Sequence, residues 1–188
     1  MPEKSTEEMI EAKGLTAQRV TKTLIDSKIL GKDIIKTETP QGAKIFIGVY
    51  TMNTGFTVVG QPVVVEAPYN ENPTPLSHAK EIISYQTHTG TTLRFAYKEY
   101  ISGLLVIGKP SASVCPENDD EEIGTTVAIN NCKASIKSGH LIKPASGLTI
   151  EEAEKLAYEN AYSAIWELEG YLLAHNLEQQ KMNKHLAE

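Results

Sequence analysis

The sequence predicts an α+β fold in which an antiparallel β-meander packs against helices from the N-terminal and C-terminal ends of the chain. Three observations predict it. Runs rich in β-branched and aromatic residues fill the middle of the chain, turn residues separate these runs, and an apolar stripe at helical spacing follows them. The 188 residues are 40% hydrophobic and 22% charged, which is ordinary for one globular domain. We therefore expect a single domain over residues 1–188.

Two short helices are expected near the N-terminus. Ser5 and Glu8 have the spacing of a capping box, in which each residue binds a backbone amide near the other, and this helix would stop at Gly14. Thr21 is the expected N-cap of the second helix. Apolar residues at helical spacing continue that helix as far as a stop at Gly31.

Six strands are expected in the middle of the chain. They are separated by typical turn residues, such as Asn53-Thr54-Gly55 and Gly60-Gln61-Pro62. In the first strand, Ile45, Ile47 and Val49 share one face, while Phe46 and Tyr50 lie on the other. The expected strands are residues 44–52, 56–59, 63–65, 93–97, 104–107 and 111–115.

The C-terminal part predicts one long amphipathic helix. Thr149 and Glu152 form a second capping-box pattern. Apolar residues then recur every three or four positions from Ile150 to Leu172, which is typical of a helix that buries one face. The last residues, 178–188, are polar, so we expect them to fray.

Two internal similarities favour an insertion or a partial duplication. Residues 55–62 resemble residues 103–110 at an offset of 48, and residues 128–131 resemble residues 157–160 at an offset of 29. Hairpins share turn residues in any case, so chance similarity and true duplication both remain open. The inserted or duplicated segments are expected around 61–102 and 137–154.

Charge and composition limit the classes of partner. The formal charge is −6, and only Arg19 and Arg94 are arginines, so a nucleic-acid duplex is not an expected partner. No apolar stretch is long enough to span a membrane, and residues 1–11 lack the apolar centre of a signal peptide. Two cysteines are too few for a disulfide scaffold. We therefore expect a cytoplasmic protein with no membrane partner.

No motif in the sequence indicates catalysis. Gly103 to Lys109 has the spacing of a phosphate-binding Walker loop, but Pro110 replaces the hydroxyl residue that would hold magnesium. The histidines and cysteines show no metal-ligand spacing, and no serine lies in a nucleophile elbow. We expect a binding protein without enzymatic activity, metal or cofactor.

The acidic segment 116–122 has three interpretations. Acidic side chains favour a helix N-terminus, which Asn118 or Asp119 would cap. Alternatively, Asn118 and a neighbouring aspartate could bind the nucleoside end of a ligand. The third interpretation, a calcium loop, lacks the expected central glycine.

Other candidate ligand-binding residues follow from side-chain chemistry. Arg19 and Arg94 could each make a bidentate contact to phosphate, although an exposed arginine is usually only a solvated charge. Phe56 and Tyr97 could stack on a purine, and the alternative for both is packing in the core.

Several segments resemble the gp49-like protein family of tailed phages. The most specific is the Trp-x-Leu-Glu-Gly-Tyr-Leu-Leu ending within residues 165–173. The other resembling segments are residues 10–17 with 19–21, 53–60, 116–124 and 157–161. This chain departs from the family pattern, because its turn motif at Gly55 is separated from Pro116 and its helix pattern is split by residues 137–154.

The family is similar to the Thoeris anti-defence sponges. This resemblance implies a phage protein of the host cytoplasm that sequesters a cyclic ADP-ribose isomer or a cyclic oligonucleotide without cleaving it, and that forms homo-oligomers. Carried onto matching positions, it implies ligand contacts at Phe56, Asn118, Asp120 and Arg19, whereas Arg94 and Tyr97 are chosen from residue chemistry alone. The alternatives are a phage structural or host-protein interaction protein with no small ligand, and an enzyme that degrades the signal.

Overall fold

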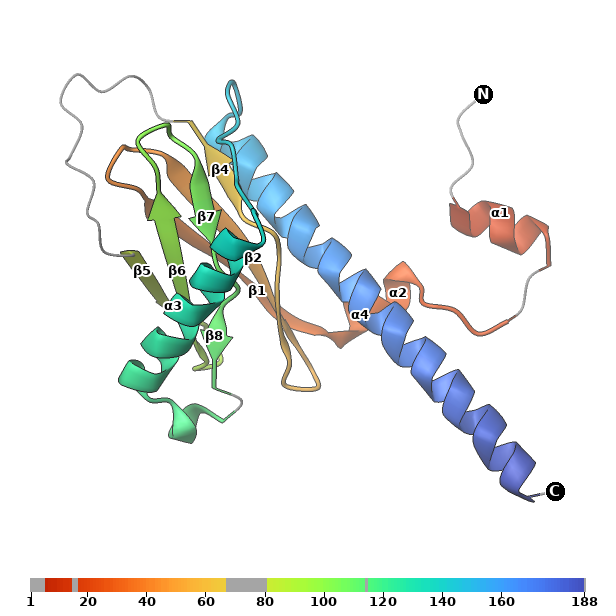
Figure 1. Ribbon diagram of the computed structural model, residues 1–188. Helices are drawn as coiled ribbons and strands as arrows, with labels where there is room; N and C mark the ends of the chain where they lie inside the picture. Colours follow the sequence, from red (N-terminus) through yellow and green to blue (C-terminus); the bar gives the residue numbers. More distant parts are fainter. Residues whose placement is uncertain (1–5, 15–16, 67–80, 114, 188) are drawn as a thin grey trace. The chain divides into compact units, whose positions relative to one another are not determined.

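The computed structural model describes residues 6–14, 17–66, 81–113 and 115–187. The chain divides into two parts, one formed by residues 28–165 and the other by residues 1–27 together with 166–188. Antiparallel sheets and helices, including a long C-terminal helix, confirm the predicted α+β class (Figure 1).

The part formed by residues 28–165 contains two four-stranded antiparallel sheets. In each sheet the second strand is central, with the first strand on one side and two short strands in line on the other. The first sheet contains β1 (Ile29–Glu38), β2 (Lys44–Met52), β3 (Thr57–Val59) and β4 (Val63–Val65). The second contains β5 (Glu81–Gln86), β6 (Thr92–Glu99), β7 (Leu105–Ile107) and β8 (Ser111–Ala112).

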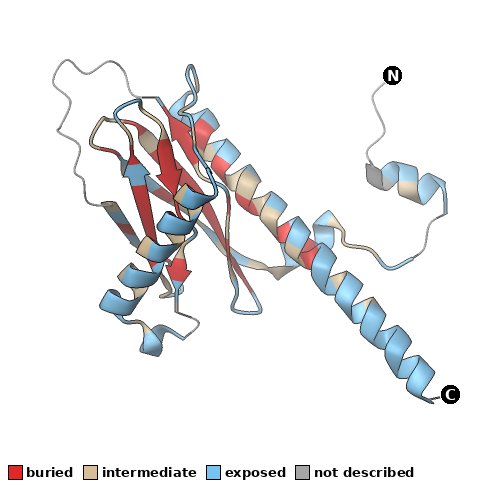
Figure 2. Ribbon diagram, in the orientation of Figure 1, coloured by how far each residue is buried: buried red, intermediate tan, exposed pale blue. Residues whose placement is uncertain are grey.

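The two sheets pack face to face, and each is covered on its outer face by a helix. The facing sides form one apolar core, to which Ile47 of β2 and Phe95 of β6 belong. Helix α3 (Glu121–Lys137) follows the short 3-10 helix η1 (Pro116–Asn118) and covers the second sheet. The first half of α4 (Ile150–Ala187) covers the first sheet. Buried residues therefore concentrate in the strands between these helices (Figure 2).

Strand β2 shows how the sequence supports this layered arrangement. As predicted, Ile45, Ile47 and Val49 lie on the face that forms the core between the sheets. Phe46 lies on the opposite face, in a cluster with Ala153 of α4. Both faces of β2 are covered, so the strand is buried along almost its whole length. Its sequence is accordingly apolar on both faces and does not alternate between polar and apolar residues.

The two sheets repeat the same local hydrogen bonds at a spacing of 48 residues. Gly60 N–H donates to Gly48 O at 2.9 Å, and Gly108 N–H donates to Ala96 O at 2.9 Å. The turns before the central strands also correspond, since the bond from Thr39 N–H to Ala43 O recurs between Thr87 and Thr91. We call β1–β4 with residues 150–165 of α4 the first repeat, and β5–β8 with α3 the second repeat.

The second repeat is nested inside the first. The chain leaves the first sheet after β4 and returns to it at Ala145, where Ala145 N–H donates to Val64 O at 2.8 Å. Glu66 N–H in turn donates to Ala145 O at 2.9 Å, so the two ends of the enclosed segment are held together. The enclosed residues overlap both segments in which an insertion or duplication is expected.

Two of the expected helix caps are present. Leu24 N–H donates to Thr21 Oγ1 at 3.2 Å, at the start of α2 (Lys22–Lys28). At α4, Glu152 N–H donates to Thr149 Oγ1 at 3.2 Å, and Thr149 N–H donates to Glu152 Oε2 at 2.9 Å. These backbone and hydroxyl donors lower the pKa of Glu152. The expected cap at Ser5, before α1 (Thr6–Ala12), lies outside the described residues.

The observed elements differ from the expected ones in four places, and the first is that the strand expected over 111–115 ends at Ala112, as β8. Helix α2 ends at Lys28, and the residues expected to continue it begin β1, because they pair with β2 from Ile29 onward. Strand β5 was not predicted, although it pairs with β6 along its whole length. Finally, α4 continues as a helix to Ala187, where the polar composition predicted fraying.

Candidate functional site

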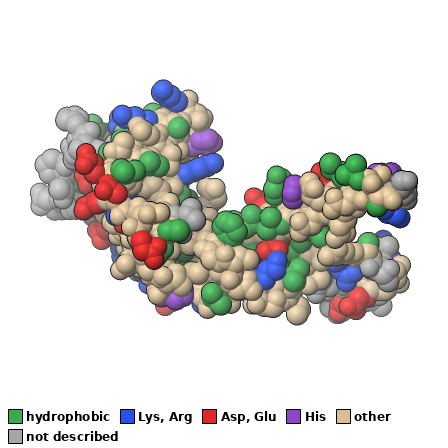
Figure 3. All heavy atoms as spheres, turned by 90° about the horizontal axis from the view of Figure 1, so that it is seen from below, with side chains coloured by type: hydrophobic (Ala, Val, Ile, Leu, Met, Phe, Trp, Pro, Cys, Tyr) green, Lys and Arg blue, Asp and Glu red, His purple; other side chains and the backbone are tan. Residues whose placement is uncertain are grey.

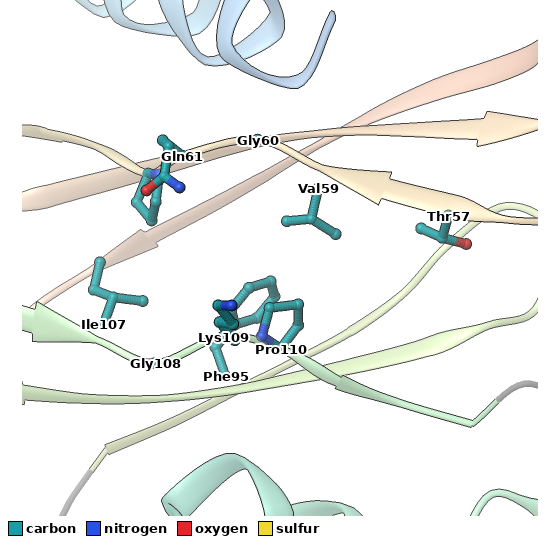
Figure 4. A pocket seen from close by; sticks show the side chains of 10 residues that line it. Thr57, Val59, Gly60, Gln61, Phe95, Ile107, Gly108, Lys109 and Pro110 are labelled. Atoms are coloured by element: carbon teal, nitrogen blue, oxygen red, sulfur yellow. The ribbon is translucent and has the colours of Figure 1, made fainter. Parts of the chain in front are cut away.

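A cavity of about 410 Å³ lies between the two repeats. Two equivalent turns line it: Gly60-Gln61-Pro62 joins β3 to β4, and Gly108-Lys109-Pro110 joins β7 to β8 (Figure 4). The remaining lining residues come from the strands and are Thr57, Val59, Phe95 and Ile107.

Each turn is held against the helix of its own repeat. A Cβ atom added to Gly60 would lie 2.4 Å from Ala161 N of α4, and one added to Gly108 would lie 2.5 Å from Cys132 N of α3. Only glycine allows the helix backbone to come so close to the turn. The two contacts are equivalent, because they involve the same turn position and the same helix position in each repeat.

An asparagine side chain fixes each turn from its helix. Asn160 Nδ2 donates to Gln61 O at 3.0 Å, and Asn131 Nδ2 donates to Lys109 O at 3.1 Å. The backbone of the middle turn residue is thereby anchored, while the side chains of Gln61 and Lys109 remain exposed. The site thus presents one amide and one ammonium group on rigid supports, as a binding site requires.

The lining of this cavity has the chemistry of a small-molecule site. Phe95 and Ile107 are buried residues of the core that reach the cavity wall, and Pro62 and Pro110 add further apolar surface. Sites of this kind combine apolar walls with a few polar groups and have volumes of roughly 300–1,000 Å³. Among the residues lining this cavity, Lys109 is the one that carries a charge.

A smaller cavity of about 270 Å³ lies at the end of α3. Its lining has no charged side chain and consists of Tyr100, Ser102, Leu104, Val106, Ile136, Gly139 and Leu141. It offers little to orient a polar ligand, so the cavity between the repeats is the better candidate site.

Arg94, a predicted phosphate ligand, makes a bidentate ion pair with Asp119. Its Nη1 lies 2.6 Å from Asp119 Oδ1, and its Nη2 lies 2.8 Å from Asp119 Oδ2. The guanidinium lowers the pKa of Asp119, and the carboxylate raises the pKa of Arg94. The Arg94 side chain is 7% exposed. In this arrangement it fixes the start of α3 to β6.

Asn118 and Asp120 lie at the same end of α3 as this ion pair. Asn118 is exposed in η1. Asp120 is the N-cap of α3, with Oδ1 accepting from Ile123 N–H at 2.9 Å. The prediction that Asn118 or Asp119 caps this helix was therefore wrong, because Arg94 engages the Asp119 carboxylate and the next residue supplies the cap.

The three remaining predicted site residues are Phe56, Tyr97 and Arg19. Phe56 is exposed in the turn between β2 and β3. Tyr97 is buried in the core between the sheets, and this burial raises its pKa to about 12. Arg19 belongs to the other part of the chain.

None of the six predicted site residues is among those lining the cavity between the repeats. Sequence reasoning missed Gln61 and Lys109 as candidate ligand-binding residues. The signal that could have found them is the similarity of residues 55–62 to residues 103–110, which places Gln61 and Lys109 at corresponding positions.

The described ranges lack two further classes of feature, a metal centre and a membrane-spanning helix. These residues contain no group of three or more His, Cys, Asp or Glu side chains that could hold a metal ion. None of the helices in the same ranges combines the length and apolar character needed to cross a membrane.

Comparisons of the chain with protein-family models, with curated proteins and with solved structures find no match.

Proposed function

We propose that this protein binds a nucleotide signal in the cavity between its repeats and sequesters it without converting it. The observation that carries this proposal is the cavity itself, where two equivalent turns place one ammonium group and one amide group beside the apolar side chains of Phe95 and Ile107. Its volume of about 410 Å³ is in the range of small-ligand sites.

The lining matches the parts of a nucleotide. Lys109 can donate hydrogen bonds to a phosphate, and such charge-assisted bonds are stronger than those between neutral groups. Phe95 and Ile107 supply apolar surface for a base or a ribose. A sponge requires tight binding and no chemical step, so these groups are sufficient for the proposed role.

The resemblance to the gp49-like phage family supplies the biological setting of the proposal. It favours a cyclic ADP-ribose isomer or a cyclic oligonucleotide as the ligand, within the cytoplasm of an infected host. It also favours a homo-oligomer. On this proposal the protein counters a host immune pathway by lowering the concentration of the free signal.

A capture experiment tests the proposal. The purified full chain is incubated with an extract of cells in which such a signal has been produced, washed, and denatured, and the released molecules are identified by mass spectrometry. We expect an intact cyclic nucleotide in the released fraction. Signal that stays unchanged in the flow-through would contradict binding, and a new product would contradict sequestration without conversion.

Exposed apolar side chains favour a second candidate function, a protein-interaction role. Ile123 and Val127 are 66% and 42% exposed and lie four residues apart, hence on one face of α3. Figure 3 shows one face of the molecule, with several separate groups of hydrophobic side chains between charged ones. Ile123→Ser with Val127→Ser would abolish capture of a host protein if this role is correct, and would leave nucleotide capture unchanged if the first proposal is correct.

A further inference from the structure

We propose that the cavity between the repeats has two chemically different ends, with Lys109 binding the phosphate and Gln61 binding the base edge of one nucleotide unit. This inference rests on the proposed function and specifies how the ligand lies in the site. It is drawn from the equivalent backbone positions of the two turns and from the different side chains, Gln61 and Lys109, that these positions carry.

The equivalence of positions 61 and 109 rests on independent contacts. The residue before each donates its backbone N–H to the central strand of its own sheet at 2.9 Å. The carbonyl of each accepts from a helix asparagine, at 3.0 Å for Gln61 and 3.1 Å for Lys109. A proline follows each of them. The two side chains therefore leave equivalent backbones on facing walls of one cavity (Figure 4).

The two side chains differ in what they can bind. The Lys109 ammonium has three donors and no acceptor, so it suits a phosphate oxygen. The Gln61 carboxamide has both a donor and an acceptor, and this pairing matches a base edge such as that of adenine. Two lysines would favour a ligand with two anionic ends, and two glutamines would favour a neutral one. One of each suits a single nucleotide unit, with its phosphate at Lys109 and its base edge at Gln61.

Three apolar side chains line the cavity between these two groups. Phe95 and Ile107 come from the second sheet, and Val59 comes from the first. None of them competes for the hydrogen bonds of the ligand. A base or a ribose lying against these side chains would be oriented by the hydrogen bonds of the ligand to Lys109 and Gln61. In this way a few polar groups give a ligand site its specificity.

Binding of AMP and adenosine to the full chain, measured by isothermal titration calorimetry, tests the phosphate end. AMP carries both proposed groups, whereas adenosine lacks the phosphate. We expect Lys109→Gln to weaken AMP binding by about tenfold or more and to leave adenosine binding unchanged. Lys133→Gln removes the same charge from an exposed position on α3 and should change neither affinity. Equal loss in both variants would overturn the assignment of Lys109.

An exchange variant tests the two-ended geometry. In Gln61→Lys with Lys109→Gln, the cation and the amide trade places between equivalent walls. We expect the AMP affinity lost in Lys109→Gln to return to near the wild-type value, because the ligand can bind in the reversed orientation. An exchange variant that binds AMP as weakly as Lys109→Gln would overturn the inference.

The outcomes separate this inference from the proposed function. A wild-type chain that captures a cyclic nucleotide but binds AMP no better than adenosine would overturn the two-ended site and leave the sponge standing. A wild-type chain that captures no nucleotide and binds neither probe would overturn both.

Discussion

The side-chain amides of Asn131 and Asn160 make the same hydrogen bond in the two repeats. Asn131 Nδ2 reaches Lys109 O at 3.1 Å, and Asn160 Nδ2 reaches Gln61 O at 3.0 Å. The two asparagines lie on different helices, yet each anchors the middle residue of a turn that lines the cavity. The geometry of the candidate site thus depends on both helices.

Replacing either asparagine by alanine should lower the free energy of unfolding by a similar amount. Each change removes one hydrogen bond and leaves a turn carbonyl without it, at a cost of about 1 kcal/mol. The double variant should show the sum, because the sites share no partner. Urea unfolding followed by circular dichroism measures these values, with exposed Asn130→Ala as the control. A large cost at one site and none at the other would contradict their equivalence.

Gly108→Ala should destabilise the protein by about 1–3 kcal/mol, because the added methyl group would meet backbone that has no room to move. The nearest atom would be Cys132 N at 2.5 Å. Gly170→Ala is the matched control, since its Cβ would have no atom within 4 Å and alanine favours a helix interior by about 0.5–1 kcal/mol. Thermal unfolding compares the two. A Gly108→Ala variant as stable as the wild type would contradict the close approach of turn and helix.

The Arg94–Asp119 ion pair occupies the place that an apolar contact holds in the other repeat. Phe46 corresponds to Arg94 at the 48-residue offset, and Leu148 corresponds to Asp119 at the 29-residue offset. Phe46 belongs to an apolar cluster against which Leu148 packs. The two repeats therefore fix the start of their helices to the central strand with different chemistry.

This correspondence predicts that the ion pair can be exchanged as a unit. Asp119→Leu alone should lower the melting temperature, because Arg94 would remain buried and charged without its carboxylate. Adding Arg94→Phe should restore much of the loss by copying the contact of the first repeat. Differential scanning calorimetry of the single and double variants measures this effect. A double variant less stable than the single one would contradict it.

The same pair predicts a dependence of stability on acid. Hydrogen bonding to Arg94 lowers the pKa of Asp119 in the folded state. A carboxylate with a depressed pKa stabilises the fold fully when the pH is above its pKa in the unfolded chain, which is about 3.9. This stabilisation is lost as the pH falls through the lower pKa of the folded state. Urea midpoints measured from about pH 5 down to pH 2 should fall more steeply for the wild type than for Asp119→Asn. Parallel curves would contradict this assignment.

Local patterns in the sequence predicted most of the secondary structure, and the segment that becomes β1 shows where such patterns fail. The strand from Lys44 to Met52 was found with its observed bounds, because its β-branched residues and flanking turns leave no alternative. The segment from Ile29 to Glu38 was missed, because its first apolar residues continue the spacing of α2 and only pairing with β2 makes it a strand. At such a boundary, pairing with a neighbouring strand decides the secondary structure, whatever the local propensity of the residues.

The candidate site was harder to predict than the fold. Gln61 and Lys109 lie in turns, and no local pattern shows that two turns far apart in the sequence line one cavity. Their proximity depends on the packing of two sheets through a shared core. Arg94 was singled out for its chemistry, but its carboxylate partner at Asp119 becomes visible only when α3 is placed on the second sheet.

The nested order of the repeats has a consequence for synthesis on the ribosome. In the second repeat, Gly108 meets Cys132 soon after both are made, whereas Gly60 of the first repeat must wait for Ala161. At about 5–20 residues per second, that interval is on the order of ten seconds. During it, the outward side of Phe46 has no helix to cover it. The second repeat is thus completed before the first, and it can serve as a template on which the first repeat closes.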